Sequence, residues 1–134
     1  MKLNNRGYML VEIILASVLA FGMAYFILNM TIELKNKNDD LLVETQVMTD
    51  QAIIMNGIIR ELKGSNCSDV SNKLKIDGKK VTIDGNVVDI VNNYAKVGTI
   101  SCNKNDNVIT VTLPLEVTQM KDKNFDIVLD WILE

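Results

Sequence analysis

Residues 8–28 read YMLVEIILASVLAFGMAYFIL, and this run sets the architecture expected of the 134-residue chain. Its 21 residues are apolar apart from a few hydroxyls and one carboxylate, Glu12. As a helix the run would be about 31 Å long, which matches the thickness of a bilayer's hydrocarbon core. We therefore expect a helix that can span a membrane.

Charges around this run predict its orientation. Lys2 and Arg6 precede it without any acid, whereas acidic residues follow it from Glu33 onward. Basic residues on the leading side favour an N-terminus that stays in the cytoplasm, so the bulk of the chain would be exported. Glu12 itself costs about 2.5–3.5 kcal/mol on insertion scales, and a chain that keeps such a charge usually has a partner charge for it.

Residues 6–12, RGYMLVE, resemble the class III leader of type IV pilins and pseudopilins. The far end of the apolar run has no small-x-small site for an ordinary signal peptidase. The resemblance covers Lys2 to Leu28 and implies that a prepilin peptidase cuts after Gly7 and methylates the new amino group of Tyr8. Residues 1–7 would then be a leader peptide, and residues 8–28 the transmembrane and filament-core helix.

The resemblance gives each of these residues a physical role. Gly7 offers no side chain to a protease subsite and leaves the backbone free to extend there. Glu12 would form an assembly salt bridge with the charged amino group of a neighbouring subunit's Tyr8, so that two costly charges neutralise each other and fix the axial register. Two features depart from the family's usual pattern. Tyr8 stands where Phe is commoner, and the helix-kinking proline of many major pilins is missing from the span, because the chain's one proline is Pro114.

A filament subunit is the function that the resemblance implies, with no enzymatic activity and no cofactor. The precursor would sit in the cytoplasmic membrane and later join an extracytoplasmic or cell-surface filament. Expected partners are other pilin or pseudopilin subunits, the prepilin peptidase, the inner-membrane assembly platform, and membrane lipid before assembly. The small head favours a minor pilin or a pseudopilin over the abundant subunit of a pilus. The alternative within the family is a pseudopilin of a type II secretion or competence DNA-uptake system. From another class, the alternative is an uncleaved, single-span membrane-anchored binding or sensor module.

Residues 29–63 predict an amphipathic continuation of the helix, because apolar residues recur at helical spacing. The recurring residues are Leu34, Leu41, Met48, Met55 and Leu62. Lys63-Gly64 marks a helix stop. Between Glu33 and Asp40 polar residues prevail, which leaves both a solvated helix and a local break open. From Ala52 to Leu62 added isoleucines (Ile53, Ile54, Ile58 and Ile59) widen the apolar face, so we expect the head to cover it.

Residues 64–134 are expected to form one small β-rich head. Residues 74–90 read as three short strands around Asp-Gly turns at residues 77–78 and 84–85. Residues 97–102 and 108–117 form a second candidate hairpin, and residues 125–133 a last strand; Pro114 argues for an edge or a bulge. The expected fold class is therefore α+β, with a long N-terminal helix packed at its C-terminal half on a small antiparallel sheet.

Catalytic motifs are missing from the sequence. The chain has no histidine, and it has no Gly-rich phosphate loop and no Cys-x-x-Cys pair, so we expect neither a catalytic residue nor a metal site. Asp77 and Asp84 sit beside glycines, where turns are a commoner role than calcium binding. Cys67 and Cys102 can form a disulfide in an exported domain or remain two buried thiols.

The charge balance gives little support to nucleic-acid binding. The net charge is −3 at pH 7, and losing Lys2 and Arg6 with a leader would make the chain more acidic. Four lysines nevertheless cluster around the first hairpin: Lys73, Lys75, Lys79 and Lys80. They could form a basic patch that touches DNA, or they could protect an exposed strand edge from pairing with another chain.

Overall fold

The structure, a computed structural model, describes residues 5–133 and divides into two compact units at the junction of Asp40 and Leu41. Helix α1 covers Asn5–Leu62 and contributes to both units. The second unit adds a short helix and small antiparallel sheets that pack on α1. The predicted α+β class is therefore confirmed.

Helix α1 begins at Asn5, three residues before the expected start, and ends at Leu62. The polar segment from Glu33 to Asp40 is helical throughout, and Lys37 Nζ lies 3.3 Å from Glu33 Oε1 one turn away. The helix stops where the sequence predicted, because Gly64 adopts a φ of +87° that side-chain-bearing residues rarely reach. The Ser65 N–H then donates to the Leu62 carbonyl at 2.9 Å.

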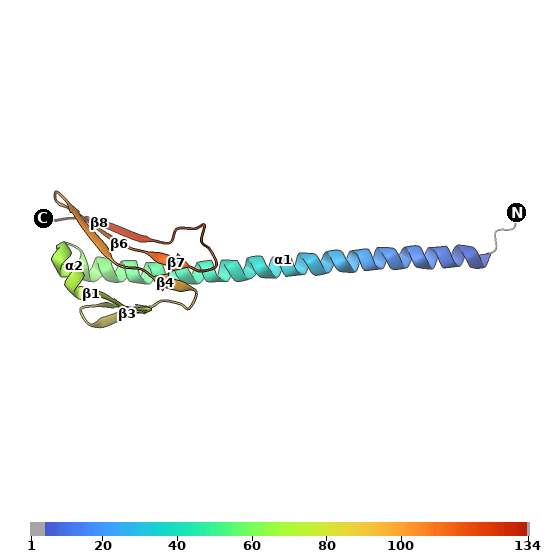
Figure 1. Cartoon of the computed structure of the whole chain (residues 1–134), viewed down its shortest axis with the longest axis horizontal. Coiled ribbons are helices and arrows are strands. Elements are labelled where there is room, and N and C mark those ends of the chain that lie inside the picture. Colours follow the sequence, from blue (N-terminus) through green and yellow to red (C-terminus); the bar gives the residue numbers. More distant parts are fainter. Residues whose placement is uncertain (1–4, 134) are drawn as a thin grey trace. The chain divides into compact units, whose positions relative to one another are not determined.

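The head follows α1 as a short helix and eight strands (Figure 1). In chain order they are α2 Cys67–Lys73, β1 Leu74–Asp77, β2 Lys80–Ile83, β3 Asn86–Ile90, β4 Ala95–Val97, β5 Ser101–Asn105, β6 Val108–Leu113, β7 Leu115–Val117 and β8 Ile127–Ile132.

The first three strands form the predicted antiparallel meander, in the order β1-β2-β3. Its second turn is Asp84-Gly85, and both residues have positive φ, which is the type I′ geometry that Asp-Gly favours. Its first turn is shifted by one residue, because Asp77 still pairs with Lys80 and the loop is Gly78-Lys79. Gly78 takes the positive φ at the first loop position, as a type II′ turn requires.

The second predicted hairpin forms only in part. Strands β5 and β6 pair, and β8 joins β6 on its other side. Predicted strand 108–117, however, is divided at Pro114 into β6 and β7, and predicted strand 97–102 is divided into β4 and β5. Pro114 lacks an N–H for a ladder, while its carbonyl accepts the Gly98 N–H at 2.8 Å. Beyond this break, β7 turns to pair with β4 as a separate two-stranded sheet.

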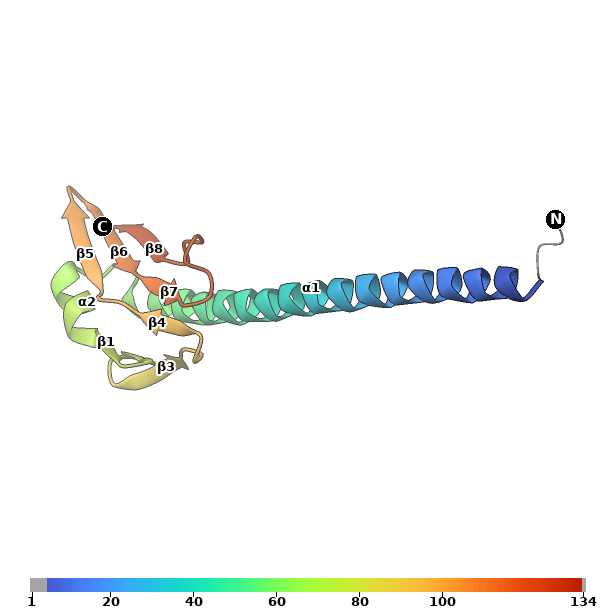
Figure 2. The same ribbon diagram turned by 45° about the vertical axis from the view of Figure 1, so that its right-hand side comes forward.

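Within the head, the β1-β2-β3 and β5-β6-β8 sheets lie at opposite edges, with β4 and β7 between them (Figures 1 and 2). Their inward side chains meet one face of α1 in a single core. The α1 members of this core are Val43, Val47, Ile54, Ile58 and Leu62. Burial alternates along β8, and the buried Trp131 donates its indole N–H to the Ser65 carbonyl at 3.0 Å.

The prediction of the covered helix face was wrong in part. Ile54 and Ile58 are fully buried, but Ile53 and Ile59 are exposed. The head approaches α1 from one side, so side chains about half a turn away stay open even when they are apolar. Val43 and Val47 supply buried contacts that the sequence pattern had not distinguished.

A disulfide joins helix α2 to strand β5. Cys67, at the start of α2, forms a disulfide with Cys102 of β5, with 5.6 Å between their Cα atoms. Of the two outcomes left open by the sequence, the structure contains the disulfide. Helix α2 itself was not predicted, because Val70 is its one buried residue and seven residues give no apolar periodicity.

Candidate functional site

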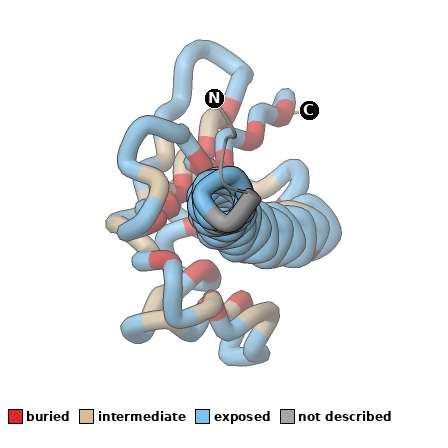
Figure 3. The backbone as a smooth tube through the Cα atoms, turned by 90° about the vertical axis from the view of Figure 1, so that its right-hand side faces the viewer, coloured by how far each residue is buried: buried red, intermediate tan, exposed pale blue. Residues whose placement is uncertain are grey.

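The first unit presents an apolar helix surface with no core of its own. From Tyr8 to Leu28 the large apolar side chains are between 54% exposed, at Ile14, and 76% exposed, at Phe21. Figure 3 shows this part of the tube in the colour of exposed residues. Among the described residues α1 is the one helix that is long and apolar enough to cross a membrane. Such a surface needs lipid or another protein against it, because water solvates it poorly.

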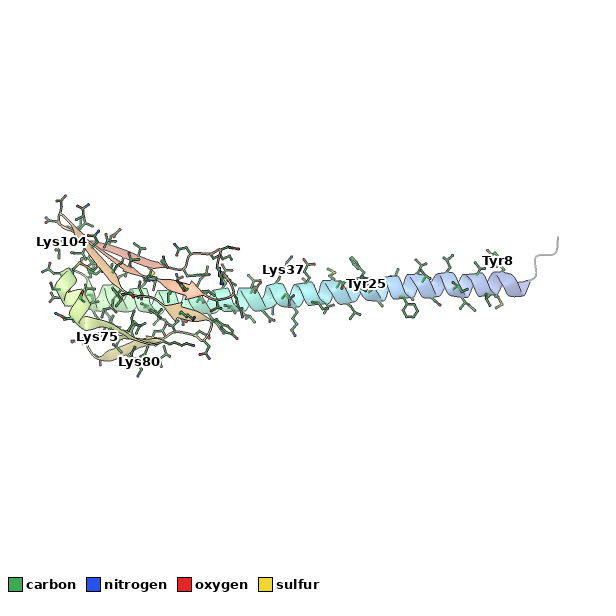
Figure 4. The ribbon with its side chains drawn as sticks, viewed as in Figure 1. Tyr8, Tyr25, Lys37, Lys75, Lys80 and Lys104 are labelled. Carbon is green, nitrogen blue, oxygen red and sulfur yellow. A yellow bond between two sulfur atoms is a disulfide. The ribbon has the colours of Figure 1, made fainter. Side chains whose placement is uncertain are left out.

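The hydroxyl groups of this helix are satisfied within the helix itself. Ser17 Oγ donates to the Ile13 carbonyl at 2.7 Å, and Thr31 Oγ1 donates to the Ile27 carbonyl at 2.8 Å. Each bond joins residues one turn apart, so it survives in an environment without water. Tyr8 and Tyr25 instead project away from the helix (Figure 4).

Glu12 is the one carboxylate of this apolar stretch. The side chain is exposed, and it takes part in no salt bridge with the described side chains of residues 7–133. A carboxylate on an apolar helix can be stabilised by water at a membrane surface or by a cation that another molecule supplies.

Two hollows lie along one face of the helix near Glu12. The first, of about 330 Å³, is lined by Tyr8, Val11, Glu12, Leu15, Ala16 and Leu19. The second, of about 470 Å³, is lined by Val18, Leu19, Gly22, Met23, Phe26 and Ile27. They share Leu19 and are therefore consecutive. Each lining includes one small residue, Ala16 or Gly22, and hollows of this kind accept the side chains of a second helix.

The expected leader junction lies in the first turns of α1. Gly7 is helical, and a Cβ built on it would have nothing within 4 Å. Lys2 lies outside the described residues, and so does the side chain of Arg6. The sequence suggested an extended backbone around Gly7, whereas the structure is helical there. Because the first turn of a helix lacks partners for its N–H groups, it can unwind at low cost.

The lysines of the first hairpin have different local partners. Lys75 and Lys80 project from the β1-β2 hairpin, while Lys104 lies on β5 (Figure 4). Lys79 Nζ donates to Asn93 Oδ1 at 2.7 Å, and Lys80 lies opposite Asp77 in the strand register. Within residues 5–133 no three His, Cys, Asp or Glu side chains gather as metal ligands would.

Sequence reasoning missed a second polar site, where β3 meets α1. Asp50 Oδ2 accepts the Asn92 N–H at 3.0 Å, and Gln46 Oε1 accepts the Asn92 side-chain amide at 2.7 Å. Asp89 lies beside Asp50, and its Oδ2 is buried without a hydrogen-bond partner in the described part of the chain. The available signal was a carboxylate between the apolar residues of a short strand.

Comparisons of this chain with protein-family models, with curated proteins and with solved structures find no match.

Proposed function

We propose that this chain is a type IV pilin-like filament subunit, made as a membrane-anchored precursor and assembled through the first unit of α1. The observation that carries the proposal is an exposed apolar helix of bilayer length with a single carboxylate, Glu12, which forms no salt bridge with the described side chains of residues 7–133. In the membrane, lipid covers this surface. In a filament, the same helices of other copies cover it.

The assembly chemistry follows from the position of Glu12. Cleavage after Gly7 would create an amino terminus on Tyr8, one turn from Glu12 along the helix. The new terminus and the Glu12 carboxylate lie at the same end of the helix. When neighbouring copies are staggered along a common axis, the terminus of one copy can pair with the carboxylate of the next. Such a pair neutralises both ions in a medium where either alone is costly. The adjacent hollows would receive apolar side chains of the neighbouring helix.

A pseudopilin of a type II secretion or competence DNA-uptake system is the alternative within the same class. The small disulfide-closed head fits either role, and no described surface favours DNA. The alternative from another class is an uncleaved anchor for a binding or sensor head. An anchor of that kind needs neither a cut at Gly7 nor a carboxylate at Glu12.

Substitution of Glu12 tests the assembly role. We expect Glu12→Gln to insert and to be processed normally but to enter filaments at least about tenfold less, because breaking a buried charge pair costs about 3–5 kcal/mol. The measurement compares the chain in sheared filaments with the chain in membranes of its native host. Glu33→Gln, which removes a carboxylate beyond the apolar run, is the matched control and should assemble normally. Normal incorporation of the Glu12→Gln chain would contradict the charge-pair model.

A further inference from the structure

The contact between β3 and α1 holds two carboxylates close together. Gln46, Asp50 and Gly57 lie on one face of α1, since they are spaced by four and seven residues. Asn92 bonds to the first two, and Val88 packs at the third, where a Cβ on Gly57 would come within 2.5 Å of Val88 Cγ1. The strand residues between these two anchors are thus held along the helix.

Asp89 lies between the two anchors and faces α1. Its Oδ1 accepts the Ile90 N–H at 2.9 Å, while its Oδ2 is buried and has no donor among the described residues. A buried carboxylate oxygen without a partner is unfavourable, because it has lost its contact with water and gained no hydrogen-bond donor. The group opposite is another carboxylate, Asp50, which also lacks a hydrogen to donate when it is ionised.

The other charged groups around Asp89 do not neutralise it. On the strand side these groups are Lys79, in the turn before β2, and Lys80, on β2. Lys79 Nζ donates to Asn93 instead, and Lys80 is exposed and lies opposite Ile90 in the register. Within residues 5–133 no salt bridge includes Asp89 or Asp50. A proton is therefore what can join the two carboxylates.

We propose that a single proton shared between Asp50 and Asp89 fastens the β1-β2-β3 sheet to α1, so that this sheet docks tightly in acid and loosens toward neutral pH. The proton supplies the donor that Asp89 Oδ2 lacks and removes the repulsion between two ions. This device acts within the second unit and does not depend on the proposed filament role.

The direction of the pH dependence follows from the site. Burial raises the pKa of the Asp89 carboxyl above its ordinary value of 3.8, and the Asp50 charge raises it further, against the opposing Ile90 N–H. The folded state thus binds this proton more readily than the unfolded state does. Its stabilising effect is complete below the ordinary carboxyl pKa and is lost as the pH rises through the raised pKa.

Hydrogen exchange of the full-length chain in detergent tests the proposal. After correction for the intrinsic exchange rate, we expect protection of the β3 amides to fall by about tenfold between about pH 4 and about pH 7, because opening is linked to release of one proton. Protection of the β6 and β8 amides serves as the internal reference and should change much less.

Two variants make the test decisive. Asp89→Asn carries a permanent amide donor toward Asp50, and Asp50→Asn does the same from the helix side, so each should remove the pH dependence of β3 protection. Asp130→Asn, at an exposed position on β8, should keep the wild-type profile. The proposal is overturned if β3 protection in the wild-type chain does not change with pH. It is also overturned if the Asp89→Asn and Asp50→Asn chains, each with normal β6 and β8 protection, keep the wild-type dependence.

Discussion

Gly57 determines how closely the head approaches α1. It is buried in the helix, and a side chain there would run into Val88 Cγ1 at 2.5 Å. A glycine inside a helix lowers helix propensity by about 1 kcal/mol relative to alanine, so a close contact is the physical reason for its presence. Gly22 lies in open space instead, because a Cβ at Gly22 would have nothing within 4 Å.

These two glycines give a matched pair of substitutions. We expect Gly57→Ala to lower the free energy of unfolding of the head by about 1 kcal/mol, since overpacking costs about 1–3 kcal/mol and the gain in helix propensity returns about 1. Gly22→Ala should leave it unchanged. Chemical denaturation of the full-length chain in detergent measures both. Adding Val88→Ala should reduce the penalty of Gly57→Ala, and a Gly57→Ala head at least as stable as wild type would show that the contact is not tight.

The elements that depend on local sequence were predictable from the sequence. Neighbouring residues are enough to predict the Asp84-Gly85 turn, the helix stop at Gly64 and the apolar span. They are also enough to single out Glu12, because it is the one carboxylate within that span. Elements that depend on distant contacts were not predictable. The separation of β4 from β5 depends on Gly98 meeting Pro114, and the Asp50–Asp89 site depends on β3 folding back along α1.

The disulfide between Cys67 and Cys102 is the covalent link between α2 and β5. It closes a loop of 35 residues in sequence separation. We expect the Cys67→Ser, Cys102→Ser double variant to lose about 3–4 kcal/mol of unfolding free energy, the size that chain entropy gives a loop of this length. Denaturation with and without a reductant measures the loss. Reductant should destabilise the wild-type head and leave the double variant unchanged, and equal wild-type curves under both conditions would contradict this account.

At the scale of the whole molecule, the two units differ in what their surfaces and interiors contain. The described residues of the first unit contribute nothing to the core and expose apolar side chains along a helix, a surface that needs lipid or another protein against it. The second unit has a core, a disulfide and polar ties to α1, such as the 2.7 Å contact between Lys123 Nζ and Glu44 Oε2. A chain built in this way can keep its head folded while the environment of its first unit changes.

Intact mass and N-terminal sequencing of the protein from its native membranes test the filament-subunit proposal most directly. We expect a chain that begins at N-methylated Tyr8, with residues 1–7 removed. A Gly7→Val variant is the control and should keep those residues, because a branched side chain obstructs the protease subsite. A wild-type chain that begins at Met1 would contradict the proposal and would identify an uncleaved anchor, whose function must then lie in the head.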